Sequence, residues 1–332
     1  MIKKYQSVLS LYETQDAIGY IKERFPRELS SRLHLIRATA PLFVDPATGL
    51  NDNLSGTERP VSFEIPGIPE IKGAQIVHSL AKWKRQALGR YGFAKNTGLY
   101  TDMNAIRRDE TPDSLHSIYV DQWDWEKVIT AEDRTIPYLM QTVQDIMDAI
   151  CATLDAVKER YPQLPVSMEK RVCFVTSQEL EDLYPNYSCK ERENAFVKEH
   201  PTTFILQIGG TLRSGKPHDF RAPDYDDWAL NGDLLIWSDV LEQAVEISSM
   251  GIRVDRESML RQCRISGCED RLELPFHQAI VNSALPLSIG GGIGQSRLCL
   301  LMLHKAHIGE VQASLWPAQM IQACNDIGIT IL

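Results

Sequence analysis

The most informative stretch of the sequence reads Ser288-Ile289-Gly290-Gly291-Gly292-Ile293-Gly294-Gln295-Ser296-Arg297. Its four glycines lead into an apolar run of good helix formers that begins at Leu298. A glycine loop that opens a helix leaves free backbone N–H groups at the positive helix end, where a phosphate or carboxylate can bind. Arg297 adds a planar set of donors that suits phosphate. The stretch predicts either an anion site or only a tight turn before a core helix.

Two familiar glycine fingerprints do not fit this stretch. Arg297 stands where a dinucleotide-binding loop needs its third glycine, and too few residues follow for a βαβαβ half. A Walker loop needs Gly-Lys-Ser/Thr, which the sequence lacks. The glycines alone therefore assign no nucleotide-binding fold.

The composition limits the class of protein. A chain of 332 residues that is 43% hydrophobic can bury a substantial core. A net charge of −9 argues against a dedicated nucleic-acid surface, so no nucleic acid is expected as a partner. Seven cysteines without a Cys-x-x-Cys pair fit a reduced cytoplasm. Without an apolar run of membrane-spanning length or a signal-like start, the chain is expected to be cytoplasmic, with no membrane partner.

Hydrophobic periodicity predicts an α+β fold, an antiparallel β-sheet flanked by helices. One helix is expected over 14–35, capped by Thr14 and either kinked or split at Pro26, and the clearest helix over 135–160. Strands are expected at 61–65, 116–126, 171–176, 203–208, 232–237 and 244–253, and further helices near 78–86, between 176 and 203, and over 256–282. No repeat or linker is visible, so residues 1–332 are predicted to form a single domain.

The predicted strand 116–126 has a polar end. Period-two alternation places five side chains on one face: Ile118, Val120, Gln122, Asp124 and Glu126. The polar members of this row suit a polar site at one end of a sheet. Trp123 and Trp125 share the opposite face and are expected to pack in the core rather than to stack on bases.

Three segments resemble the motifs of the class II aminoacyl-tRNA synthetases. Pro41, after a helix and an extended run, resembles motif 1; residues 107–126 resemble motif 2, an arginine loop before a strand; residues 290–297 resemble motif 3, a glycine-rich strand-to-helix step. The pattern is nearest to the aspartyl and asparaginyl synthetases, in which a carboxylate seven residues before an arginine is similar to Glu246 and Arg253.

The ammonia-dependent asparagine synthetases, or aspartate–ammonia ligases, resemble the chain over essentially its whole length. The strings that carry this resemblance are Asp52-Asn53-Leu54-Ser55-Gly56 and residues 78–86, 119–125, 221–228, 248–253 and 288–297. That family makes asparagine from aspartate, ammonia and ATP through a β-aspartyl-adenylate, and releases AMP and pyrophosphate. The resemblance implies the same catalytic activity here, with Mg²⁺ as the cofactor and ATP as co-substrate.

The resemblance also implies a homodimer built through motif 1. The apolar stripe of Ile18, Phe25 and Leu29 either contributes to that interface or belongs to the core.

The resemblance implies a role for each polar residue of the ATP site. It places Arg107 on the α-phosphate and the reacting carboxylate, where charge builds during displacement. Arg297 is expected to contact the far phosphates or to stack on adenine. Asp233 and Glu246 are the expected Mg²⁺ ligands, since Mg²⁺ takes one or two carboxylates plus phosphate oxygens. The remaining expected ATP-binding residues are Ser117, Gly292 and Gly294.

The aspartate and ammonia sites follow from the same resemblance. Lys84 and Arg253 are expected to hold the α-carboxylate, although Lys84 alone also fits a solvated helix lysine. Gln122 and Asp124 are expected to receive the amino group. Two carboxylates, Asp52 and Asp226, are candidates for ordering or deprotonating ammonia, and Ser79 lines the substrate site. The negative loop around Asp226 raises proton affinity and attracts ammonium, but simple solvation of the loop, and turn capping by Ser79 and Ser117, are open alternatives.

Other functions fit the sequence less well. A tRNA synthetase needs an anticodon-binding module, for which the chain has no spare length. A non-catalytic relative would tolerate loss of the motif arginines and the metal-binding carboxylates, all of which are present. A glutamine-dependent asparagine synthetase needs a cysteine where Ile2 stands. His304 and His307 indicate a helix end rather than a metal site.

Overall fold

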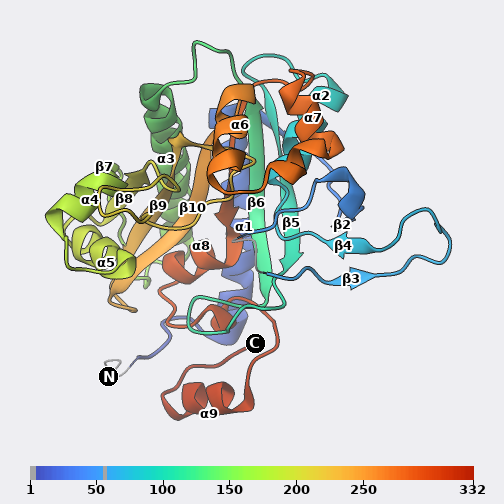
Figure 1. The fold of residues 1–332 in the computed structure, drawn as a ribbon. Helices are drawn as coiled ribbons and strands as arrows, with labels where there is room; N and C mark the ends of the chain where they lie inside the picture. The colour runs from blue at the N-terminus through green and yellow to red at the C-terminus, as the bar shows by residue number, and fades with distance from the viewer. Residues whose placement is uncertain (1–4, 55–57) are drawn as a thin grey trace.

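The computed structural model describes residues 5–54 and 58–332, so Ile2 and the Ser55-Gly56 part of the 52–56 string lie outside it. Its centre is an eight-stranded sheet with the strand order β1-β5-β6-β11-β10-β9-β8-β7 (Figure 1). The strands are β1 (Leu35–Arg37), β5 (Gly98–Ile106), β6 (Tyr119–Val128), β11 (Ser288–Gly294), β10 (Gln243–Arg253), β9 (Asp226–Ser238), β8 (Thr202–Leu206) and β7 (Cys173–Thr176). Only the two outer pairs, β1–β5 and β7–β8, are parallel, which confirms the predicted α+β class.

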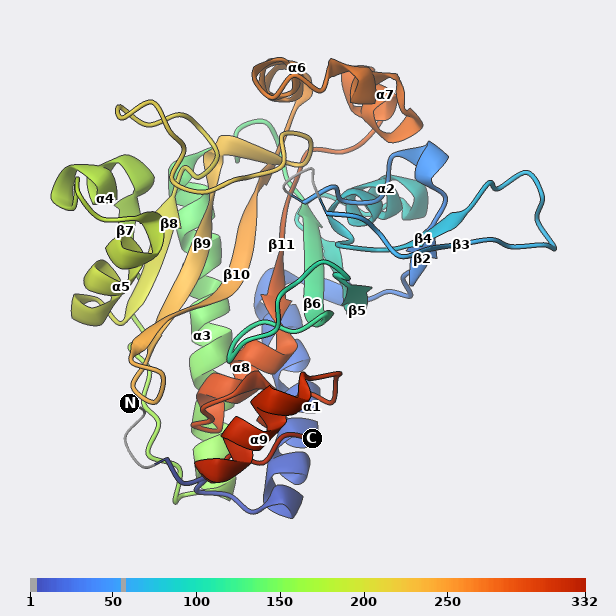
Figure 2. The ribbon, with the colours of Figure 1, turned by 60° about the horizontal axis from the view of Figure 1, so that its bottom comes forward.

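Helices cover the sheet unequally. The long helices α1 (Leu11–Leu33) and α3 (Ile136–Arg160) pack side by side on one face (Figure 2). Helices α4 (Ser177–Leu183) and α5 (Cys189–Glu199) lie beside β7 and β8, as predicted for the segment between those strands. The remaining helices are α2 (Ala81–Tyr91), α6 (Arg256–Ile265), α7 (Pro275–Val281), α8 (Gln295–Met302) and α9 (Ala318–Asp326), with short 3₁₀ turns at Pro46–Thr48, Glu269–Glu273 and Ile308–Glu310.

A second, three-stranded sheet lies at the edge of the molecule beyond β5 (Figure 1). It consists of β2 (Phe43–Val44), β4 (Ala74–Ile76) and β3 (Ser62–Phe63), in the order β2-β4-β3. Among the described residues, no helix combines the length and apolar character needed to cross a bilayer.

The main core lies between the large sheet and the α1–α3 layer. Trp123 and Trp125 are completely buried there, as the alternation in β6 predicts. The ring centroids of Phe25 and Trp123 lie 4.6 Å apart. Phe25 and Leu29 are both completely buried. The apolar stripe of α1 therefore belongs to the core and is not available to a dimer interface.

The predicted cap of α1 is wrong, and one of the two alternatives at Pro26 is excluded. The helix begins at Leu11, and Ser10 caps it in a reciprocal capping box with Glu13, so Thr14 is not the cap. Pro26 does not split the helix, which continues to Leu33. Proline inside a helix costs about 3 kcal/mol, whereas burial of each large apolar side chain contributes about 1.5–3 kcal/mol. Complete burial of Phe25 and Leu29 on either side of Pro26 is enough to offset that cost.

Candidate active site

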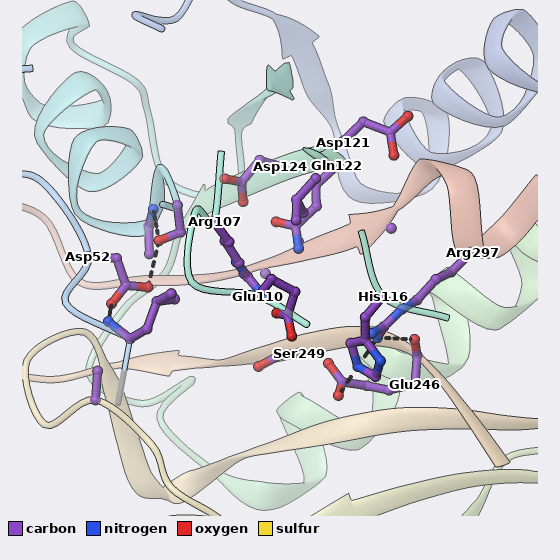
Figure 3. A pocket seen from close by; sticks show the side chains of 18 of the residues that line it. Asp52, Arg107, Glu110, His116, Asp121, Gln122, Asp124, Glu246, Ser249 and Arg297 are labelled. Carbon is purple, nitrogen blue, oxygen red and sulfur yellow. Dashed lines mark hydrogen bonds and ion pairs between the residues drawn. The ribbon is translucent and has the colours of Figure 1, made fainter. Parts of the chain in front are cut away.

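The predicted site residues converge on one pocket of about 460 Å³ (Figure 3). The pocket lies on the sheet face opposite the α1–α3 layer, because Gln122 and Asp124 alternate with the buried Trp123 and Trp125 along β6. Of the predicted site residues, the pocket is lined by Asp52, Ser79, Lys84, Arg107, Ser117, Gln122, Asp124, Asp226, Glu246, Arg253, Gly292, Gly294 and Arg297. Asp233 is the one predicted residue that does not line it.

The glycine stretch forms the floor of the pocket, but as a strand. The glycine loop expected from residue type is wrong, because Ser288–Gly294 is β11, paired on both sides with β6 and β10. The strand-to-helix step implied by the motif 3 resemblance is confirmed, since α8 follows β11 directly. A Cβ atom at Gly291 would lie 2.4 Å from the Cβ of Met250, and one at Gly292 would lie 2.3 Å from Oε1 of Gln122. Gly291 is therefore required by its close approach to the backbone of β10, whereas a side chain at Gly292 would displace the end of the Gln122 side chain.

The helix that follows does bind an anion, but the anion belongs to the protein. The backbone N–H of Ser296, in the first turn of α8, donates to Oδ1 of Asp121 at 3.1 Å, and its hydroxyl donates to the same oxygen at 2.7 Å. Lys22 of α1 lies 3.0 Å from Oδ2 of Asp121. A carboxylate at a helix N-terminus is favourable, and here Asp121 takes the N–H of Ser296 that a bound anion could otherwise accept. Asp121 had no predicted role.

One buried cluster joins Arg253, Glu126 and Asp226. The guanidinium of Arg253 donates to Glu126 through Nε at 3.1 Å and Nη2 at 2.9 Å, and its Nη1 donates to Oδ1 of Asp226. Ser288 donates to Glu126 at 2.8 Å. Asp226 is buried, so the alternative of a solvated loop carboxylate is wrong. Burial raises the pKa of Asp226 although Arg253 opposes the rise, so burial, more than nearby negative charge, is the main cause.

A second buried pair joins Lys84 to Asp124. The Lys84 ammonium donates to Oδ1 of Asp124 and, at 3.1 Å, to the carbonyl of Gly291. Its side chain is completely buried, so the alternative of a solvated lysine is wrong. Burial lowers the pKa of Lys84, and Asp124 opposes that change. The backbone N–H of Leu80, which precedes α2, donates to Oδ2 of Asp124 at 3.2 Å and fixes the carboxylate.

Asp52 also lines the pocket, and two donors among the described residues hold its carboxylate. The Ser79 hydroxyl donates to Oδ2 of Asp52 at 2.9 Å, and the backbone N–H of Leu54 donates to Oδ1 at 2.9 Å. Ser79 thus orients Asp52 as well as lining the pocket. The hydroxyl of Ser117, elsewhere in the pocket wall, donates to the hydroxyl of Ser314 at 2.8 Å.

Two of the predicted arginines, Arg107 and Arg297, line the pocket. Arg107 follows β5, its backbone N–H donates to the carbonyl of Ile118 at 2.8 Å, and its Nε is buried without a hydrogen-bond partner among the described residues. Nη1 of Arg297 donates to the carbonyl of Glu246 at 3.0 Å, and Figure 3 shows the two side chains together. Although burial favours the neutral acid, Arg297, Lys190 and the other cations nearby hold the pKa of Glu246 below its usual range.

Asp233 is engaged by an arginine that had no predicted role. Nη2 of Arg221 donates to both carboxylate oxygens of Asp233, at 2.6 and 2.7 Å, and Nη1 donates to Ser249 at 2.8 Å. Arg221 lines the pocket, and its Nε has no partner among the described residues. Burial, reinforced by nearby Glu246, raises the pKa of Asp233 to about 7 although Arg221 opposes the rise. Arg221 is the first residue of the 221–228 string that carries the family resemblance, and this position is the sequence feature that could have marked it as a site residue.

The described residues contain no group of three or more His, Cys, Asp or Glu side chains that could hold a metal ion. A Mg²⁺ ion held by one or two carboxylates and by substrate phosphates needs no such group. His304 follows the end of α8, and His307 caps the start of the 3₁₀ turn Ile308–Glu310, where its Nδ1 accepts the backbone N–H of Gly309 at 3.0 Å. Both therefore lie at helix ends, as predicted.

Comparison with known families gives one match over nearly the whole chain. The family model described as aspartate-ammonia ligase matches residues 12–328. An aspartate–ammonia ligase of Clostridium perfringens (strain SM101 / Type A) is 56% identical over 330 residues, covering 99% of this chain and 98% of the relative. That of Pediococcus pentosaceus is 56% identical over 328 residues, with the same coverage of 99% and 98%.

Solved structures share the fold at much lower identity. Asparaginyl-tRNA synthetase from Pyrococcus horikoshii, complexed with asparaginyl-adenylate, has a TM-score of 0.68 and 16% identity, covering 92% of this chain and 70% of that one. Asparaginyl-tRNA synthetase from Entamoeba histolytica, in complex with asparaginyl-adenylate, has a TM-score of 0.67 and 13% identity, covering 91% and 66%. These likenesses confirm the predicted class II synthetase-like architecture.

Proposed function

Because the chain belongs to the aspartate–ammonia ligase family, we propose that the pocket between β6, β10 and β11 is where ATP activates aspartate and ammonia then amidates it. The chain is an ATP-dependent carbon–nitrogen ligase that makes asparagine from aspartate and ammonia. One observation carries the assignment of the site. A single pocket joins an arginine-rich end, with Arg107 and Arg297, to an end where Lys84 and Arg253 are each paired with carboxylates.

The first step joins aspartate to the α-phosphorus of ATP. An oxygen of the β-carboxylate attacks that phosphorus, the bond to the β-phosphate breaks, and pyrophosphate leaves. Negative charge grows on the phosphate oxygens as the bonds exchange, and the guanidinium of Arg107 stabilises it. Its buried Nε, which lacks a partner among the described residues, supports this role. Arg297, Ser117, Gly292 and Gly294 line the rest of the ATP site.

Mg²⁺ is the proposed cofactor, and the donor set of the pocket fits it in part. Glu246 lines the pocket beside Arg297 and keeps a pKa below its usual range, so it offers a charged ligand. Asp233 lies behind Arg221 and contributes a ligand only if that pair opens. When bound, the ion supplies neutralisation of the triphosphate charge.

Aspartate enters by replacing internal partners of the two buried cations. We assign its α-carboxylate to Lys84 and to Nη1 of Arg253, which Asp226 occupies in this structure. Glu126 keeps its two bonds to the other side of the guanidinium and holds the arginine in place. Gln122 and Asp124 receive the amino group. Substrate binding thereby releases Asp226 from its ion pair.

The released carboxylate suits the second step. Ammonium must lose a proton before its nitrogen can attack, and a buried carboxylate with a raised pKa accepts a proton more readily than an ordinary aspartate. Asp226 and Asp52 are therefore assigned to ammonium. The nitrogen attacks the acyl carbon, the carbon–oxygen bond to the phosphate breaks, and AMP leaves.

A homodimer remains part of the proposal, with residues 1–332 of each chain acting as one catalytic domain. Ile36, Leu42 and Phe43, which flank Pro41 of motif 1, are exposed. An apolar surface at this place favours association with a second copy. Sedimentation of the intact chain and of Phe43→Glu tests this, with a shift to monomer expected for the variant.

The experiment that tests the function incubates the protein with aspartate, ATP, Mg²⁺ and either ammonium or glutamine. Asparagine and AMP are expected in equal amounts with ammonium, and no asparagine with glutamine. Formation of ADP in place of AMP, or charging of tRNA by the same preparation, would contradict the proposal.

A further inference from the structure

A buried ionic cluster beside the pocket is not used by the mechanism above. Its centre is Asp224, whose carboxylate is completely buried. Oδ2 of Asp224 accepts from Nζ of Lys82 at 2.6 Å and from Nε2 of His277 at 2.9 Å, and Nη1 of Arg271 lies 3.5 Å from it. Lys82 and His277 are 2% and 0% exposed. None of these four side chains lines the pocket.

Such a cluster is a costly way to gain stability. Burying a carboxylate and an ammonium is expensive even when they pair, and well-packed apolar side chains of similar volume are often as stable or more so. Burial by itself raises the pKa of Asp224, yet Lys82 and His277 hold the pKa below its usual range, so the group is charged. A charged cluster with fixed geometry is better suited to setting the positions of the segments that it joins.

The segments joined by this cluster carry Asp52 and Asp226, the two carboxylates proposed to bind or deprotonate ammonium. Asp224 lies two positions before Asp226 on the approach to β9. Lys82 donates with the same ammonium group to the carbonyl of Asn51, at 3.1 Å, which directly precedes Asp52. One ammonium thus holds the Asp52 loop and the Asp226 segment to each other.

Three further contacts fix the Asp52 loop. The side chain of Asn51 accepts the backbone N–H of His78 at 2.9 Å, and Nδ1 of His78 lies 3.1 Å from the carbonyl of Asp52. Gly49, with φ of +74°, packs so closely on His277 that a Cβ there would lie 3.1 Å from Nδ1 of the ring. The loop therefore rests on α7 as well as on α2, which lie at the same end of the sheet in Figures 1 and 2.

We propose that Asp224 is a positioning residue for the amidation step, because through Lys82 and His277 it sets the separation of Asp52 and Asp226. The inference rests on the proposed function of those two carboxylates. In the described part of the chain, the residues assigned to adenylation, Arg107, Arg297 and Glu246, make no hydrogen bond or ion pair with the cluster, and they come from other segments. Loss of the cluster should therefore impair use of ammonium more than formation of the adenylate.

The test compares Asp224→Asn with the wild-type protein in three assays: aspartate-dependent ATP–pyrophosphate exchange without a nucleophile, amidation with ammonium, and amidation with hydroxylamine. Hydroxylamine is largely uncharged at neutral pH and needs no proton removed before it attacks. A misplacement of about 1 Å can cost on the order of 100-fold in rate. We expect the KM for ammonium to rise about 10- to 100-fold, with exchange and hydroxylamine turnover changed by less than about 3-fold.

Glu181→Gln is the matched control, because Glu181 is a buried carboxylate of α4, 3.5 Å from Arg192 and outside the pocket. It should leave the KM for ammonium unchanged. If Asp224→Asn does not fold, the pair His277→Gln and His277→Ala replaces it. Glutamine keeps a donor for Asp224, so the ammonium KM should stay near wild type in His277→Gln and rise in His277→Ala.

An unchanged ammonium KM in these variants, or equal losses in all three assays, would overturn the positioning role. Absence of exchange in the wild-type protein would instead overturn the proposed function of the pocket. The two failures are therefore distinguishable.

Discussion

Replacing Arg107 by alanine tests the charge stabilisation at the arginine-rich end of the pocket. Arg107 enters the pocket from the end of β5, and its Nε is buried without a partner among the described residues. Two unit charges about 4 Å apart interact by about 4 kcal/mol at an effective dielectric constant near 20. Removal of a single preorganised donor from a transition state costs about 2.7–4 kcal/mol, which is 10²- to 10³-fold in rate. Arg107→Ala should therefore lower the rate of adenylate formation by 2 to 3 orders of magnitude.

The assay is aspartate-dependent ATP–pyrophosphate exchange in the absence of ammonium, which reports the first step alone. Arg108→Ala is the matched control, since Arg108 is the adjacent arginine and does not line the pocket. Thermal unfolding should be nearly unchanged in both variants. Exchange that stays within about threefold of wild type in Arg107→Ala, or an equal loss in Arg108→Ala, would refute the role assigned to Arg107.

Three further predictions concern other parts of the molecule. Gly292→Ala should raise the KM for aspartate on the order of 10-fold, because the new Cβ would lie 2.3 Å from Oε1 of Gln122; Gly19→Ala, with open space around it, should not. Phe25→Ala should lower the free energy of unfolding, measured by chemical denaturation, by about 3–5 kcal/mol at every protein concentration. A loss that depends on protein concentration would instead show that the apolar stripe of α1 contributes to a dimer interface. Burial lowers the pKa of Lys84 below 10.5, and the ammonium attracts the α-carboxylate only while protonated. The KM for aspartate should therefore rise with pH before pH 10.5 is reached, and Lys84→Arg should move this rise to higher pH; the same alkaline limb in both proteins would contradict the assignment.

Local patterns in the sequence predict the parts of the fold that depend on one segment. The alternation in β6 separates Gln122 and Asp124 from Trp123 and Trp125 because a strand has a fixed period, whatever its neighbours are. The same is true of α3, in which the helical spacing of apolar residues continues over the whole of Ile136–Arg160. The Ser10 cap of α1 also has a local sequence signal, since Ser10 and Glu13 form a capping-box pattern, which Thr14 lacks.

Features set by residues far apart in the chain could not be predicted in this way. By residue type the glycines of β11 favour a loop because glycine is permissive, whereas Gly291 is required by its close approach to Met250 on the neighbouring strand β10. Asp121 of β6 accepts from the first turn of α8, and Arg221, from the segment before β9, pairs with Asp233 within β9. A sequence shows which residues carry charge, but only the packed structure shows which charges already have partners.

In the proposed mechanism an oxygen of the aspartate β-carboxylate becomes bonded to the α-phosphorus of ATP, and that oxygen later leaves with AMP. Aspartate labelled with ¹⁸O in the β-carboxylate, incubated with ATP, Mg²⁺, ammonium and the intact protein, tests it directly by mass spectrometry of the products. One labelled oxygen should appear in the phosphate of AMP, and none in pyrophosphate. Label in inorganic phosphate together with ADP, or unlabelled AMP, would contradict the account.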